Sequence, residues 1–188
     1  MAFGSENNFF SKDKDFLDEY RNKLINYLNI YNREEEVINL YLWAYDQCVE
    51  NPDYYDGTTM TEDLDFGGLD VEAMLHDVLY VVLKVSSSFK YQYLADITLR
   101  VEMSKHNKSS LETDKRWFFL LLKTPLLVPF SRYIKKRKMN KENKEKMRQI
   151  FSLLINNYKI NWFKDFLVFT ICTYTIFSII KTTINLLT

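Results

Sequence analysis

The chain has 188 residues and no net charge at neutral pH, a length that suits one domain or one domain with an extension. It holds only 4 glycines and 3 prolines beside 14 phenylalanines and 13 tyrosines. This shortage of turn-forming residues argues against a β-sandwich and against a dinucleotide-binding fold, so we expect a mainly α-helical protein. Cys48 and Cys172 lack the spacing of a metal site. We interpret them as free thiols of a reducing compartment, and one disulfide between them stays open.

The first 50 residues predict a pair of helices. Apolar side chains recur at helical spacing over residues 11–30, with Ser11 as the expected N-cap, and over residues 33–50, with Asn32 as the expected N-cap. An Asn-Pro pair ends the second helix. The stretch 51–68 has no clear periodicity, and we expect it to form an acidic loop.

Two further helices are predicted in the middle of the chain. Asp70 is the expected N-cap of a helix that runs to about Val85, and the serines 86–88 form a turn into a helix over residues 90–105. A turn of about four residues makes the two helices antiparallel. A fifth helix that contains Trp117 follows, and prolines then interrupt the chain.

The last third of the chain is first basic and then apolar. Residues 132–148 hold nine lysines and arginines beside two glutamates, and a helix capped by Asn140 is predicted over residues 141–158. Residues 166–180 are uncharged, but 15 helical residues span only about 22 Å of the roughly 30 Å of a bilayer core. For the stretch 162–188, a buried helix, an assembly helix and a tail anchor therefore stay open, and its composition leaves room for a strand.

Charge divides the chain into two unlike parts. Residues 1–131 hold 13 basic and 22 acidic residues, a net charge of −9, whereas residues 132–188 hold 12 and 3, a net charge of +9. Such a division indicates two faces with different partners, or parts that attract one another or neighbouring copies. We expect an N-terminal helical pair (1–50), a central helical domain (51–131) and a basic segment with an apolar C-terminal helix (132–188).

A candidate site lies in the stretch LDVEAMLHDVLYVVLKV, where Asp77 directly follows His76. On a helix, Tyr80 shares a face with His76. The antiparallel turn places Asp96 within one helical turn of His76 on the neighbouring helix. Asp96 would accept the Nδ1 proton of His76 and leave Nε2 free as a base for water. Asp77 points elsewhere, and its oxygens suit Ca²⁺ near the acidic loop.

These residues carry a resemblance to two families. The pattern Asp70-x-x-Ala73-x-x-His76-Asp77-x-x-Tyr80, with Ala95-Asp96 twenty residues after the histidine, is similar to phospholipase A2. It is most similar to the compact, disulfide-free domains that some viruses carry in virion proteins. The resemblance implies that His76 activates water, that Asp77 binds calcium, and that Asp96, supported by Tyr80, orients the histidine. The same HD-x-L-Y…AD pattern, followed by the aromatic-rich KRWFF at 115–119, resembles a small family of tailed-bacteriophage proteins, and this resemblance fits better overall.

The phospholipase calcium loop has no counterpart in this chain. That loop is a Tyr-x-Gly-x-Gly type sequence whose backbone carbonyls complete the metal site, and neither Tyr55-Asp56-Gly57 nor Phe66-Gly67-Gly68 reproduces it. We therefore expect no cofactor, or Ca²⁺ if the site is active. Two interpretations stay open: His76, Tyr80 and Asp96 form a buried network that joins two helices, or they form the centre of a hydrolase.

Other charged groups are interpreted as surface features. His106 near the end of a predicted helix is expected to be solvated, where it favours the helix dipole. A basic run suits the phosphates of nucleic acid or of anionic lipid, although a solvated or protein-facing surface is the commoner explanation. This run comprises Arg132, Lys135, Lys136, Arg137 and Lys138.

By resemblance, the leading hypothesis is a virion component of a tailed phage, in the neck, tail or assembly pathway. It would assemble in the host cytoplasm and act through contacts with other virion proteins or with copies of itself, on an inactive phospholipase A2-like domain. One alternative is an active Ca²⁺-dependent lipid hydrolase used in membrane penetration. Another is a membrane protein made during infection and anchored by residues 162–188, with the basic run on the cytoplasmic side.

Overall fold

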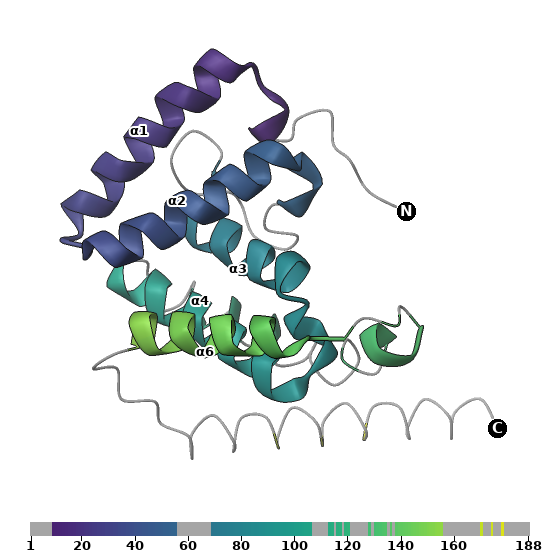
Figure 1. Cartoon of the computed structure of the whole chain (residues 1–188). Coiled ribbons are helices and arrows are strands. Elements are labelled where there is room, and N and C mark those ends of the chain that lie inside the picture. Colours follow the sequence, from purple (N-terminus) through teal and green to yellow (C-terminus); the bar gives the residue numbers. More distant parts are fainter. Residues whose placement is uncertain are drawn as a thin grey trace.

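The computed structural model describes residues 9–55, 69–106, 130–134 and 138–155, together with a few single positions. The described part of the chain is mainly helical and holds no strand (Figure 1), which confirms the class expected from composition. The single positions are 113, 114, 116, 117, 119, 120, 128, 136, 170, 174 and 178.

The N-terminal part forms a hairpin of α1 (Lys14–Ile30) and α2 (Glu35–Glu50). The predicted N-cap at Ser11 is wrong, because Ser11 ends a short 3-10 helix, η1 (Phe9–Ser11), whose two phenylalanines are buried. Asp13 caps α1 instead, and its carboxylate accepts a hydrogen bond from the backbone N–H of Phe16 at 2.9 Å.

The turn between α1 and α2 also differs from the prediction. Asn32 was expected to cap the second helix, but it lies in the turn with a φ of 51°, a conformation that asparagine tolerates better than most residues. Glu34 is the residue that precedes α2, and its side chain makes no capping hydrogen bond. Helix α2 ends at Glu50, just before the Asn-Pro pair, as predicted, and a 3-10 turn, η2 (Pro52–Tyr54), begins the stretch that was expected to be a loop.

The central helices are α3 (Val71–Val82) and α4 (Phe89–Lys105), joined by a 3-10 turn, η3 (Val85–Ser87). The predicted cap is confirmed, since the Asp70 carboxylate accepts a hydrogen bond from the N–H of Ala73 at 2.9 Å. Most side chains of α3 are buried, as expected of a helix that is covered on several sides.

The basic segment enters the fold through a π-helical turn, η4 (Phe130–Ile134), and through α6 (Lys141–Ile155). Asn140 caps α6 as predicted, because its Oδ1 accepts a hydrogen bond from the N–H of Asn143 at 2.7 Å. The Asn143 amide in turn donates to the carbonyl of Leu83 at 3.2 Å, which ties the start of α6 to the end of α3. Residues 156–158 of the predicted helix lie outside the described residues.

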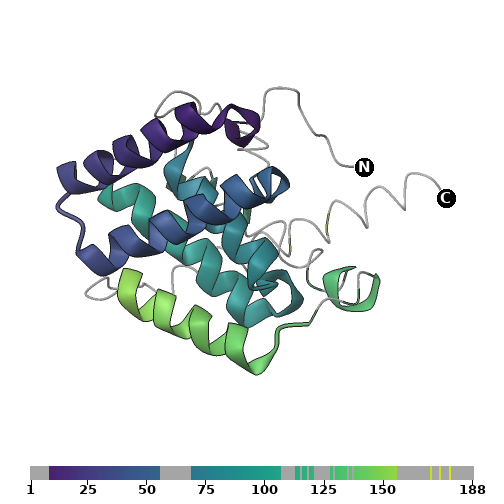
Figure 2. The same cartoon turned by 45° about the horizontal axis from the view of Figure 1, so that its top comes forward.

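One apolar core takes side chains from η1 through α6, and so from all three stretches of the chain that charge and pattern distinguished. The helix α2 lies across α3, and α6 runs beside α4 and also contacts α2 (Figures 1 and 2). Helix α3 therefore lies between the α1–α2 hairpin and α4. This position explains the apolar character of its sequence.

The C-terminal stretch 162–188 lies outside the described residues except for Thr170, Tyr174 and Ser178, which are helical and exposed. Among the helices of the described residues, none has both the length and the apolar character that a membrane span requires. Cys48 is a buried free thiol in α2, and Cys172 lies outside the described residues.

Candidate functional site

The structure brings His76 of α3 and Asp96 of α4 into direct contact. The His76 Nε2 lies 2.9 Å from the Asp96 Oδ1, and both residues are buried, with 6% and 1% of their surface exposed. The short turn at η3 sets this register, and the predicted proximity of the two residues is confirmed. Tyr80, one turn after His76, donates a hydrogen bond from its hydroxyl to the same Asp96 Oδ1 at 2.5 Å.

The roles of the two imidazole nitrogens differ from the prediction. Asp96 was expected at Nδ1 with Nε2 free, but Asp96 contacts Nε2, and Nδ1 faces the Asp77 Oδ1 at 3.4 Å. The reason is reach, because Nε2 is the nitrogen farther from the backbone and so extends across to α4. Nδ1 stays beside its own helix, where Asp77 is the next residue. Asp77 therefore lies against the histidine and does not point away from it.

The surroundings of His76 favour its protonated form. Burial alone would lower the pKa of this imidazole, but the hydrogen bonds and negative charges of Asp77 and Asp96 outweigh burial and raise the pKa to about 9. At neutral pH the ring is then an imidazolium between two carboxylates. A protonated imidazole has no lone pair with which to take a proton from water, so this arrangement is unsuited to general base catalysis.

Tyr80 completes the group and has a buried neighbour that the sequence did not suggest. Its ring lies 4.4 Å from that of His76, centroid to centroid. Burial, together with the charge of Asp96, raises the pKa of Tyr80 well above its ordinary value, so the phenol stays a donor. Gln92, one turn before Asp96 on α4, lies beside the Tyr80 hydroxyl and is 1% exposed.

The described residues supply no further ligands for a calcium ion at Asp77. Within them, no group of three or more His, Cys, Asp or Glu side chains is arranged to hold a metal ion. Residues 56–68, where the resemblance would place a calcium loop, lie outside the described part of the chain. Tyr55, which precedes them, is buried, and its hydroxyl accepts a hydrogen bond from the N–H of Asp70 at 3.2 Å.

A second buried polar group surrounds His106, and here the prediction of a solvated residue is wrong. His106 is 2% exposed, and its Nδ1 contacts the carboxyl group of Glu72 on α3. The rings of Tyr27 and Tyr31 from α1 pack against it, because the α1–α2 hairpin covers the end of α4. Tyr27 also donates a hydrogen bond to Glu72 at 3.3 Å.

The Glu72–His106 pair is best described as two neutral groups. Burial, and then the charge of nearby Asp70, raises the pKa of Glu72 to about 8. Burial lowers the pKa of His106 to about 4. At neutral pH Glu72 therefore keeps its proton and donates a hydrogen bond to the His106 Nδ1, which avoids two charges in a site shielded from water. Asp70 itself receives a hydrogen bond from Arg116 at 2.5 Å.

A third buried carboxylate, that of Glu102, lies one turn before His106. It accepts hydrogen bonds from Arg33 at 2.5 Å and from Tyr41 at 3.1 Å, and Lys105 lies 3.2 Å from its other oxygen. Sequence reasoning missed both Glu72 and Glu102. For Glu72 the available signal was a glutamate inside an otherwise apolar helix, which requires a partner when it is buried. For Glu102 the mixed sequence of α4 held no such signal.

The described residues also enclose a surface cavity of about 490 Å³ between the α1–α2 turn, the end of α4 and α6. Its lining contains neither His76 nor Asp96, so it is separate from the candidate site. The lining residues are Asn32, Arg33, Glu34, Glu36, Val37, Lys105, Gln149, Ser152 and Leu153.

Comparisons of the chain with models of protein families, with curated proteins and with solved structures found no match.

Proposed function

We propose that the chain is a non-catalytic structural protein. In this proposal, His76 and Asp96 hold α3 against α4 and do not catalyse a reaction. The observation that carries this proposal is the environment of the imidazole. Both ring nitrogens face carboxylates, the ring is 6% exposed, and its pKa is raised to about 9. A buried ion pair of this kind holds two helices in one register.

The setting that we propose is the virion of a tailed phage, in the neck, tail or assembly pathway. This part rests on the resemblance of the HD-x-L-Y…AD pattern to a tailed-phage family. Contacts with other virion proteins or with copies of the chain would use its charged faces and its exposed apolar side chains, among which Ile30 is 74% and Tyr133 is 79% exposed.

The setting is tested by mass spectrometry of purified mature particles from cells that make the protein. We expect the chain to copurify with the particles at a constant ratio to the major capsid protein. Its presence in infected cells together with its absence from mature particles would contradict the proposal.

A second candidate is a Ca²⁺-dependent lipid hydrolase, and one specific observation favours it. With Asp96 at Nε2, the nitrogen left for water would be Nδ1, which lies on the side of Asp77, the residue that the resemblance assigns to calcium. A cation bound by Asp77 would draw its carboxylate away from Nδ1 and oppose protonation of the ring. The inactive and active forms of the site therefore differ in what Asp77 binds.

The two candidates are separated by incubating the full chain with mixed phospholipid vesicles, with and without Ca²⁺. The structural role predicts no calcium-dependent release of fatty acid and a His76→Gln variant with a lower unfolding temperature. Release that requires Ca²⁺ and disappears in His76→Gln, while the variant remains folded by circular dichroism, would establish the hydrolase.

A further inference from the structure

A basic surface forms where four elements meet: the end of α3, the start of α4, η4 and the start of α6. The Arg132 Nε donates a hydrogen bond to the carbonyl of Ser87 at 2.8 Å, and the N–H of Met139 donates to the Ser87 Oγ at 3.1 Å. Asn143 donates to the carbonyl of Leu83. These contacts place Arg132 and the start of α6 beside the η3 turn, which Lys84 precedes and Lys90 follows.

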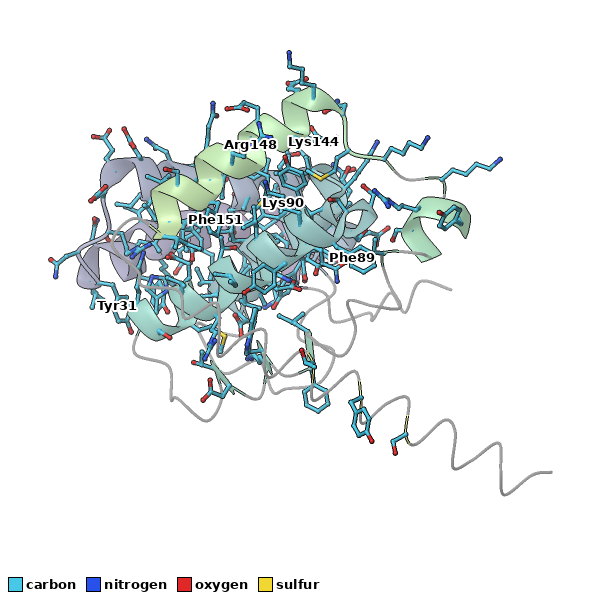
Figure 3. All side chains as sticks on the ribbon, turned by 90° about the horizontal axis from the view of Figure 1, so that it is seen from below. Tyr31, Phe89, Lys90, Lys144, Arg148 and Phe151 are labelled. Atoms are coloured by element: carbon cyan, nitrogen blue, oxygen red, sulfur yellow. The ribbon has the colours of Figure 1, made fainter. Side chains whose placement is uncertain are left out.

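The cations of this surface are exposed and come from three separate stretches. Figure 3 shows Lys90 of α4 and Lys144 and Arg148 of α6 on the same side of the molecule. Two glutamates of α6, Glu142 and Glu145, are the acidic residues of the described chain between Arg132 and Arg148. We define the basic surface by seven exposed residues: Lys84, Lys90, Arg132, Lys138, Lys141, Lys144 and Arg148.

Helix α6 orders its cations along one face. Lys141, Lys144 and Arg148 are three and four residues apart, so they follow one another at about 5 Å along the helix axis. This spacing is of the same order as the rise per phosphate along a nucleic-acid strand. Arg148 also forms an exposed ion pair with Glu145 of the same helix at 3.0 Å, which a phosphate would have to replace. Lys146 leaves this face, because its Nζ lies over the ring of Trp43 at 3.8 Å from the centroid.

Aromatic rings lie among these cations with their surfaces open to solvent. Phe89, which precedes Lys90, is 48% exposed, and Tyr133, which follows Arg132, is 79% exposed. The positions of Phe89 beside Lys90, and of Phe151 beside Arg148, can be followed in Figure 3. Cations with interleaved exposed rings are the combination that binds phosphates and unpaired bases together.

We propose that the basic surface binds single-stranded nucleic acid without regard to sequence. The lysines and arginines contact the phosphates, and bases stack on Phe89 and Tyr133. Stacking requires an unpaired base, which favours a single strand over a duplex. An anionic membrane fits less well, because a membrane-bound helix buries a continuous apolar face, whereas here each exposed ring adjoins a charged residue. The inference is independent of the role of His76.

The test uses the full chain and a fluorescent oligothymidylate of about 20 nucleotides, with binding followed by anisotropy. We expect affinity to fall as salt rises from about 50 to 200 mM. The triple variant Lys141→Gln, Lys144→Gln, Arg148→Gln should bind at least about tenfold more weakly. The slope of log binding constant against log salt concentration (the salt slope) should fall in magnitude by about 2, since each phosphate contact contributes about 0.7 for a single strand. The matched control removes three positive charges in and just before α1: Lys12→Gln, Lys14→Gln, Lys23→Gln.

The rings are tested by Phe89→Ala and Tyr133→Ala, which should each weaken binding about fivefold or more while leaving the salt slope unchanged. Tyr133 is so exposed that its loss leaves folding intact, which circular dichroism verifies. The proposal is overturned if the oligonucleotide does not bind, or if the α1 control weakens binding as much as the α6 triple. Binding to phosphatidylserine vesicles without binding to the oligonucleotide would show a membrane surface in its place.

Discussion

The charge of His76 depends on its neighbours, because two carboxylates more than offset the cost of burying an imidazolium. Its pKa is about 9 in the folded chain and about 6.5 in an unfolded one, so folding favours the protonated ring. The resulting stabilisation is complete below about pH 6.5 and is lost as pH rises through 9. Residue-level chemistry thus makes the stability of the protein dependent on pH in the mildly alkaline range.

This dependence is measurable by urea unfolding of the protein and of His76→Gln at pH 6 and at pH 9. We expect the free-energy difference between the two proteins to shrink at the higher pH by roughly 3 kcal/mol at most, which is the value of the pKa shift. Using the difference removes the contributions of other groups. A difference that stayed constant or grew with pH would show that the ring is neutral in the fold.

Glu72 offers the opposite case, an acid whose raised pKa costs stability. It takes up a proton on folding at any pH between about 4.5 and 8, so the stability it contributes falls as pH rises through that window. In Glu72→Gln an amide NH₂ at the position of Oε1 can donate to both the His106 Nδ1 and the Tyr27 hydroxyl, and this group does not titrate. We expect the free energy of unfolding of the variant, relative to that of the wild type, to rise between pH 5 and pH 7 by up to about 3 kcal/mol in thermal or urea unfolding.

A control for this variant is Glu72→Ala, which leaves His106 and Tyr27 without their contact to Glu72. It should be less stable than the wild type at pH 5, where Glu72 is protonated and makes both contacts. If Glu72→Gln instead lost stability relative to the wild type as pH rose from 5 to 7, the buried pair would be a carboxylate and an imidazolium.

Between elements, the same residues decide how firmly α3 is held to α4. Asp96→Asn keeps an oxygen that can accept from the His76 Nε2–H, but it removes the carboxylate charge that offsets burial of the imidazolium, and we expect a loss of up to about 3 kcal/mol in urea unfolding. The double variant with His76→Gln removes the charge as well, so its loss should be smaller than the sum of the single losses. A coupling energy near zero would mean that the two groups do not stabilise each other.

The helices themselves were predictable where the chain encodes their ends. Asp70 and Asn140 cap α3 and α6 as expected, since each precedes an apolar helical pattern and can bond the first turn by itself. The cap at Ser11 failed for a nonlocal reason. Phe9 and Phe10 pack on Tyr20 and Tyr45, and this packing pulls the chain into a 3-10 turn that occupies Ser11.

The candidate site was likewise predictable only where local sequence determines it. The contact of His76 with Asp96 follows from a short turn between two helices, which the sequence shows. The burial of His106 does not follow from the local sequence, because it depends on the α1–α2 hairpin lying over the end of α4. No local pattern encodes that placement. The basic surface likewise requires residues 84–90 and 132–148 to meet, which only the tertiary structure shows.

At the scale of the whole molecule, Glu102 and its neighbour Lys105 connect the α1–α2 turn to α6. Glu102 binds Arg33 in that turn, and Lys105 donates a hydrogen bond to the carbonyl of Leu154 at the end of α6. Arg33 and Glu102 side chains are 9% and 1% exposed, so the pair is shielded from water. Removing one member of such a pair leaves the other buried with too few partners.

We therefore expect Arg33→Leu to lower the free energy of unfolding by about 3 kcal/mol and to make the amides of α2 and α6 exchange faster together. The matched control is Arg21→Leu, which breaks the ion pair of Arg21 with Asp46 between α1 and α2. That pair is exposed and screened, so its loss should cost less than about 1 kcal/mol. Equal losses in the two variants would contradict the view that burial gives the Arg33–Glu102 pair its weight. Faster exchange confined to the α1–α2 hairpin would show that the pair holds the hairpin alone and does not link it to α6.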